Sequence, residues 1–173
     1  MKTAFVVVEA GALIPSNTPD GRINMDYPQE LQPRDRTRKS SVMQIMNMSK
    51  NLRPAQLTDS GLSSHGAPIV GPDLVVESGN GRTLSLIRAY SEGTAEQYRQ
   101  YLVDNAALYG LKEDKVKGMR QPIMVRVRLD DVDRAQFARD SNLSDLQGMA
   151  PTEVARVDAE QIDDKMMALF SPQ

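Results

Sequence analysis

The sequence contains no cysteine, and this absence removes several classes of site at once. The chain can form no disulfide, no thiolate metal site and no cysteine nucleophile. Tryptophan is also absent and aromatic residues make up only 5%, so aliphatic residues and 10 methionines must fill the core. No apolar run is long enough to cross a membrane, and the short apolar start is no signal peptide. These absences predict a cytoplasmic protein.

An excess of basic charge is lacking as well. The formal net charge is -2, so no overall positive field attracts nucleic acid, and any such contact needs a local patch. One candidate patch comprises Arg34, Arg36, Arg38 and Lys39, which could contact phosphates or form a solvated charged run before a helix. With 173 residues, 40% of them hydrophobic, the chain can bury the core of one domain.

The hydrophobic pattern predicts an α+β fold, with a small mixed β-sheet and flanking helices. Strands are predicted over residues 3–8, 67–70, 74–76 and 122–127, and helices over residues 42–52, 82–90, 94–109, 131–137 and 151–169. Ser40 or Ser41 is the predicted cap of the first helix, and residues 15–36 form a long loop. Residues 1–130 are thus expected to be the core domain, and residues 131–173 a helical segment that packs on it.

The segment most typical of a binding site is the glycine loop between residues 76 and 83. Gly79 and Gly81 can adopt positive φ, so that successive backbone N–H groups converge on one anion. The following helix N-terminus adds partial positive charge, and the Arg82 guanidinium can bind two phosphate oxygens. The loop Gly79-Asn80-Gly81-Arg82 therefore predicts a phosphate site, although neither Walker A nor GxGxxG is matched. The alternative is that Asn80-Gly81 only turns the chain from strand to helix.

Two further residues are candidates for chemistry. Glu77, just before the loop, could hold a metal ion or activate a water, or it could be a solvated strand end. His65 is the only histidine and could be a general base or a surface residue. Neither a Ser-His-Asp arrangement nor a His/carboxylate metal spacing occurs.

The order of these segments resembles a known family. Gly79-x-x-Arg82 between a hairpin and a helix resembles the GxxR box of the ParB N-terminal domain and its sulfiredoxin-like relatives. Gln32-Pro33-Arg34 resembles the QPR that precedes the first helix of that family. Residues 27–36, 66–72 and 75–82 carry a closer similarity, to the DdrB-like ParB domains of large phage and plasmid proteins, and the resemblance covers almost the whole chain.

This resemblance implies a set of ligands and residue roles. ParB-type domains bind cytidine triphosphate and magnesium, sulfiredoxins use ATP, and other relatives are serine kinases or proposed nucleases. The implied ligands are therefore Mg²⁺ and a nucleoside triphosphate, with Arg34 and the glycine loop on the phosphates. Asn142, together with Glu77, would position the magnesium.

The sequence also departs from the family. The ENxxR box of ParB has Ser141 in place of its Glu and Asp145 in place of its Arg, which argues against hydrolysis in the ParB manner. Sulfiredoxin activity is excluded because it needs a cysteine. The leading hypothesis is a domain that binds nucleotide or DNA phosphates in phage or plasmid DNA processing, as a candidate NTPase or nuclease. The alternative is a non-catalytic interaction module, and in both cases the domain is expected to belong to a larger polypeptide.

Overall fold

The computed structural model describes residues 2–58, 66–129 and 153–154. Within these residues the strands form one mixed sheet in the order β3-β2-β4-β1-β5. The strands are β1 (Lys2–Glu9), β2 (Ile69–Val70), β3 (Val76–Ser78), β4 (Pro122–Arg128) and β5 (Glu153–Val154). β4 pairs antiparallel with β1 and parallel with β2, which in turn pairs antiparallel with β3. The predicted α+β fold with a small mixed sheet is confirmed.

The two central strands are buried on both faces. β1 places six consecutive residues in the interior, and every residue of β4 is buried. Branched residues such as Val6 and Val125 face each other across this pair, as expected for a strand that packs on both sides. The polar side of β4 is therefore also internal, and it carries the buried Arg126 and Arg128 toward the hairpin.

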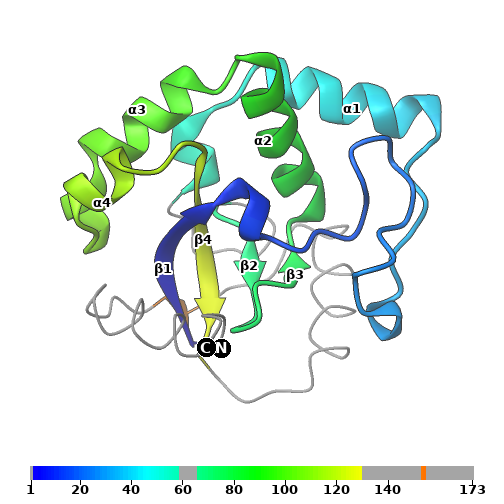
Figure 1. Cartoon of the computed structure of the whole chain (residues 1–173), viewed down its shortest axis with the longest axis horizontal. Coiled ribbons are helices and arrows are strands. Elements are labelled where there is room, and N and C mark those ends of the chain that lie inside the picture. The colour runs from blue at the N-terminus through cyan, green and yellow to red at the C-terminus, as the bar shows by residue number, and fades with distance from the viewer. Residues whose placement is uncertain (1, 59–65, 130–152, 155–173) are drawn as a thin grey trace.

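The helices form an arc along one side of the sheet (Figure 1). They are α1 (Lys39–Lys50), α2 (Asn80–Glu92), α3 (Glu96–Asp104) and α4 (Glu113–Lys117). Short 3-10 helices cover Ala10–Ala12, Gln29–Leu31, Pro54–Leu57 and Ala106–Tyr109. Leu86 of α2 and Tyr98 of α3 are fully buried in the main core. No helix in the described ranges has the length and apolarity needed to cross a membrane.

The helices predicted over residues 42–52, 82–90 and 94–109 are found with shifted ends, whereas nearly all residues of the two later predicted helices lie outside the described part of the chain. Gly93 and Gly110 both adopt the left-handed conformation and end helical segments, as glycine favours. The single helix predicted over residues 94–109 is instead α3 followed by a 3-10 turn. The prediction of a serine cap is wrong, because α1 begins at Lys39 with Arg38 as its N-cap, so both serines lie inside the helix.

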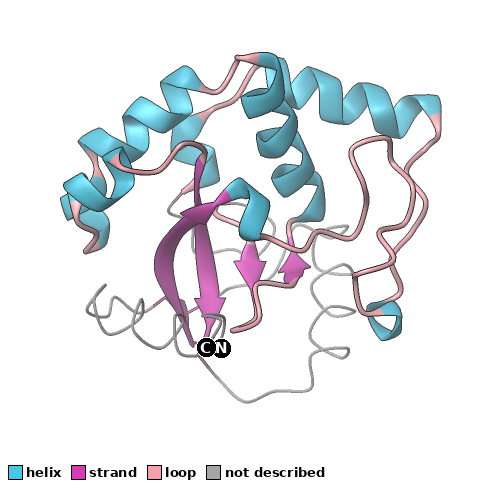
Figure 2. Ribbon diagram, in the orientation of Figure 1, coloured by secondary structure: helices cyan, strands magenta, loops and turns pink. Residues whose placement is uncertain are grey.

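The long loop before α1 is seated on the sheet by a second, smaller core. Tyr27 and Leu31 pack with Val75 and the partly buried Ile14. The Tyr27 hydroxyl donates a 2.6 Å hydrogen bond to the carbonyl of Val76, just before the glycine loop. Figure 2 shows this loop-rich segment at the opposite end of the molecule from α3 and α4. A segment without regular structure is thereby anchored beside the start of α2.

The C-terminal segment is described at only two residues. Glu153 and Val154 form β5 and pair parallel with Lys2 and Thr3, where the sequence predicts the first turn of a helix. The edge of β1 offers backbone hydrogen bonds to such a segment, and this pairing overrides the local helical pattern. The remaining residues of the predicted segment 131–173, together with His65 and Asn142, lie outside the described residues.

Candidate functional site

The glycine loop forms the N-terminus of α2. Gly79 is the N-cap, with a φ of 88°, and it turns the chain directly from β3 into the helix. The first helical hydrogen bond runs from the Thr83 N–H to the Gly79 carbonyl, at 2.9 Å. The N–H groups of Asn80 and Gly81 precede this ladder and point out of the positive end of the helix. The predicted passage from strand through glycine to helix is confirmed, with the helix starting at Asn80 rather than Arg82.

Arg82 folds back over Gly79. A Cβ added at Gly79 would lie 2.7 Å from Nη2 of Arg82 and 2.9 Å from its Cζ. Nη1 of Arg82 donates a 2.9 Å hydrogen bond to the carbonyl of Gly66, which fixes the plane of the guanidinium. Gly79 is therefore favoured by its positive φ, and a larger residue there would also displace the Arg82 guanidinium from this position.

The side chain of Asn80 holds the loop together. Its Oδ1 accepts a 2.7 Å hydrogen bond from the Ser16 N–H. Its Nδ2 faces the Tyr27 hydroxyl at 3.5 Å and the Val76 carbonyl at 3.4 Å. Because both ends of the amide are engaged, Asn80 offers an anion its backbone N–H rather than its side chain. Its side chain instead connects the long loop to the helix.

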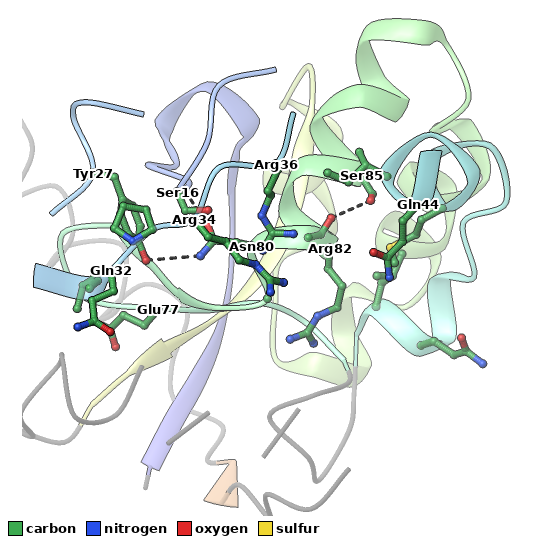
Figure 3. A pocket seen from close by; sticks show the side chains of 18 of the residues that line it. Ser16, Tyr27, Gln32, Arg34, Arg36, Gln44, Glu77, Asn80, Arg82 and Ser85 are labelled. Carbon is green, nitrogen blue, oxygen red and sulfur yellow. Dashed lines mark hydrogen bonds between the residues drawn. The ribbon is translucent and has the colours of Figure 1, made fainter. Parts of the chain in front are cut away.

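A cavity of about 680 Å³ opens at this helix N-terminus, between α1, the glycine loop and the segment before α1. Among the described residues, four arginines line it: Arg34, Arg36, Arg53 and Arg82. Figure 3 shows Arg34, Arg36 and Arg82 gathered around the start of α2. The α1 side adds Gln44, Ile45 and Met48. Of the candidate phosphate-binding residues, Gly79, Asn80, Gly81, Arg82 and Arg34 all line this one cavity.

Arg36 was predicted only as one member of the basic patch, and it lines the cavity beside the start of α2. Its Nη1 would lie 3.7 Å from a Cβ at Gly81, so the guanidinium sits over the first turn of α2. Its Nε is buried and has no hydrogen-bond partner among the described residues. Burial, and then the charge of Arg34, lowers the pKa of Arg36 below the ordinary value for arginine. Of the predicted basic cluster, Arg34 and Arg36 line the cavity, whereas Arg38 and Lys39 do not.

Glu77 is buried in an ion pair, and the interpretation as a solvated strand end is wrong. Its exposed fraction is 2%, and Oε1 and Oε2 accept hydrogen bonds from Nε and Nη2 of Arg128 at 2.8 and 3.1 Å. Gly71 in the hairpin turn makes room for this carboxylate, because a Cβ there would lie 2.6 Å from Oε2. Glu77 also lines the cavity, where its charge is balanced from below by Arg128. Glu77 thus lies beside the predicted phosphate loop, where its carboxylate is the counter-ion of Arg128.

The described residues contain no group of three or more His, Asp or Glu side chains that could hold a metal ion. Glu77 is the one carboxylate among the described residues that line the cavity, and the other predicted magnesium ligand, Asn142, lies outside the described ranges. The cavity is therefore cationic in character. Guanidinium groups and helix N–H groups of this kind bind anions through charge-assisted hydrogen bonds.

Comparison with known proteins gives one match. A family model described as the ddrB-like ParB superfamily domain matches residues 1–129. The matched range includes the whole cavity described above. No curated protein and no solved structure matches the chain significantly.

Proposed function

Because the chain belongs to the ddrB-like ParB superfamily, we propose that its arginine-lined cavity binds the phosphate chain of a nucleotide, in a protein of phage or plasmid DNA processing. The observation that carries this proposal is the meeting of Arg34, Arg36 and Arg82 at the N-terminus of α2. A volume of about 680 Å³ lies in the range of small-molecule sites, so a nucleotide fits better than a length of duplex. DNA phosphates presented by a single strand are the other ligand of the same chemistry.

The position of each group in the cavity suggests which phosphate it would bind. The N–H groups at the start of α2 would bind one phosphate, because they precede the helical hydrogen-bond ladder. Arg82 would add a planar donor fork beside that phosphate, oriented by its bond to Gly66. Arg36, whose Nε is buried without a partner among the described residues, would bind an adjacent phosphate. Two linked phosphates would then bridge the two guanidinium groups.

Magnesium does not fit the described residues on their own. Glu77 already gives both carboxylate oxygens to Arg128, and Mg²⁺ needs near-octahedral oxygen coordination. Hydrolysis of a nucleotide or of a phosphodiester, with Glu77 as catalytic residue, would require the carboxylate to leave this pair. We therefore propose that the cavity binds its ligand and that Glu77 serves there as a structural counter-ion.

Substitution of individual arginines tests the proposal. We expect Arg82→Ala to lower affinity for a nucleoside triphosphate about tenfold to a hundredfold, as loss of a charge-assisted bond predicts. Arg34→Ala should lower it less, because Arg34 is exposed and exposed charges contribute about 1 kcal/mol or less. Arg88→Ala is the matched control, since Arg88 lies on the same helix, pairs with Glu92 and does not line the cavity.

The titration uses each labelled ribonucleoside triphosphate, and a labelled oligothymidylate, at two salt concentrations, with and without magnesium. Site-bound phosphate should leave the ranking of the three variants unchanged at the higher salt. Equal losses for all three variants, vanishing together at high salt, would mean diffuse attraction and would refute a phosphate site. Tighter binding of the oligonucleotide than of every triphosphate would assign the cavity to single-stranded DNA.

One observation favours a second candidate function. The only carboxylate among the described residues that line the cavity forms a buried ion pair, which suits a module that binds a ligand or partner without chemistry. Such a module would retain the cavity as a scaffold. Failure of every nucleotide and of the oligonucleotide to raise the melting temperature would favour this candidate, because a ligand of the native state must stabilise it.

A further inference from the structure

In the loop before α1, Asn17 and Gly21 form hydrogen bonds with the backbone of the cavity arginines Arg34 and Arg36, and we call this pair of residues the clamp. Its centre is Asn17, whose exposed fraction is only 1%. Nδ2 of Asn17 donates to the carbonyl of Gly21 at 3.0 Å and to the carbonyl of Arg34 at 2.8 Å. One buried amide therefore joins a tight turn to the segment that carries the arginines.

The other half of the clamp is Gly21. Its carbonyl also accepts a 2.7 Å hydrogen bond from the N–H of Arg36, so it receives donors from both sides. Gly21 has a φ of +90°, and a Cβ there would lie 2.6 Å from the carbonyl oxygen of Arg36 and 2.8 Å from its carbonyl carbon. These are backbone atoms, which cannot rotate away as a flexible side chain can. Any other residue at this position must displace the chain at Arg36.

We propose that Gly21 and Asn17 are positioning residues for Arg36, holding its guanidinium over the start of α2 for an anionic ligand. The clamp fixes the backbone at Arg34 and at Arg36, and Arg36 then reaches Gly81 with its Nε buried. Preorganisation of this kind raises affinity because the ordering cost is met before the ligand arrives. This inference rests on the anion site proposed above.

A comparison of two glycines isolates the effect. Gly21→Ala and Gly93→Ala both put alanine at a positive φ, +90° and +77°, but a Cβ at Gly93 meets nothing within 4 Å. Both variants should lose melting temperature from strain at positive φ, and Gly21→Ala should lose more, because its Cβ must also displace the backbone at Arg36. Only Gly21→Ala should weaken binding of inorganic tripolyphosphate, by about threefold to tenfold in a calorimetric titration well below either melting temperature.

A double-mutant cycle then separates positioning from general loosening. Arg36→Ala alone should weaken tripolyphosphate binding about tenfold or more. In that background Gly21→Ala should have no further effect, because the group that it positions is absent. Asn17→Ser, whose short side chain cannot reach both carbonyls, gives the same cycle if Gly21→Ala does not fold.

The outcomes distinguish the inference from the function on which it rests. If the wild-type chain binds no tripolyphosphate and no nucleotide, the proposed function fails. If the wild type binds but Gly21→Ala binds as tightly as Gly93→Ala, the clamp has no positioning role and this inference alone fails. Additive losses for Gly21→Ala and Arg36→Ala would also overturn it, because they would show that the glycine acts elsewhere.

Discussion

Replacing Glu77 by glutamine tests the ion pair beneath the cavity. The side chains of Glu77 and Arg128 are 0% and 10% exposed, so the pair is shielded from water. Breaking a buried pair by removing one partner costs about 3–5 kcal/mol, since an uncompensated charge stays inside. The glutamine amide keeps one oxygen that can accept from Arg128, but its NH₂ group replaces the other acceptor and would face the second N–H donor of Arg128. We therefore expect a loss near the lower end, about 3 kcal/mol of unfolding free energy.

Thermal and urea unfolding measure this loss. For a chain of 173 residues, about 3 kcal/mol corresponds to a fall in melting temperature of roughly 6–12 °C. Glu113→Gln is the matched control, because Glu113 pairs with Lys117 on α4 and both side chains are 58% exposed. That helical surface pair should contribute only about 0.3–0.5 kcal/mol.

The same variant distinguishes a structural role of Glu77 from a catalytic or metal-binding one. If Glu77 serves as a counter-ion, Glu77→Gln should lose stability whether or not magnesium is present. A variant within about 1 kcal/mol of wild type, yet without any magnesium-dependent nucleotide binding, would refute the structural assignment. It would restore Glu77 as a metal ligand.

Two other features give direct tests. Gly79→Ala forces alanine to a φ of 88° and into the Arg82 guanidinium, so it should cost about 1–2 kcal/mol in urea unfolding. It should also weaken triphosphate binding in the same direction as Arg82→Ala in the nucleotide titration. Burial raises the pKa of Tyr98, so the folded state keeps this proton where the unfolded chain loses it, above about pH 10. Unfolding free energy should therefore fall as pH rises above this value in urea titrations, and less steeply in Tyr98→Phe, whereas an unchanged slope would contradict the assignment.

Local sequence signals were sufficient for the elements that carry the site. The β-branched run of β1, the turn between β2 and β3, and the glycine before α2 each have a strong short-range signature. The passage of the glycine loop from strand to helix N-terminus was also predictable, because a positive φ at Gly79 is a local property of that residue. That the loop binds an anion stays a prediction. The same local approach failed at the start of α1, where the serine cap rule was overridden and the helix begins at Lys39.

Long-range contacts decided what the sequence could not. Glu77 is spaced 51 residues from Arg128, and no local pattern indicates that these two side chains form a pair. Arg36 was visible only as one member of a charged run, because its burial depends on the fold of the loop around Asn17. The double hydrogen bond of Asn17 itself has no sequence signature beyond an asparagine near a glycine. Such clamps become visible only when the carbonyls that they join are placed in space.

The cationic cavity is expected to lower the stability of the free chain while it raises the affinity for the proposed anionic ligand. Burial, and then the like charge of the neighbouring Arg34, lowers the pKa of Arg36. This arrangement disfavours the charged form, yet arginine stays protonated at neutral pH, so the unliganded fold bears the cost. The clamp at Asn17 and Gly21 prevents relief by movement of the backbone. If the cavity binds a polyanion as proposed, the negative charge of the ligand would offset this repulsion, so affinity should fall when the contacts of Asn17 and Gly21 are removed.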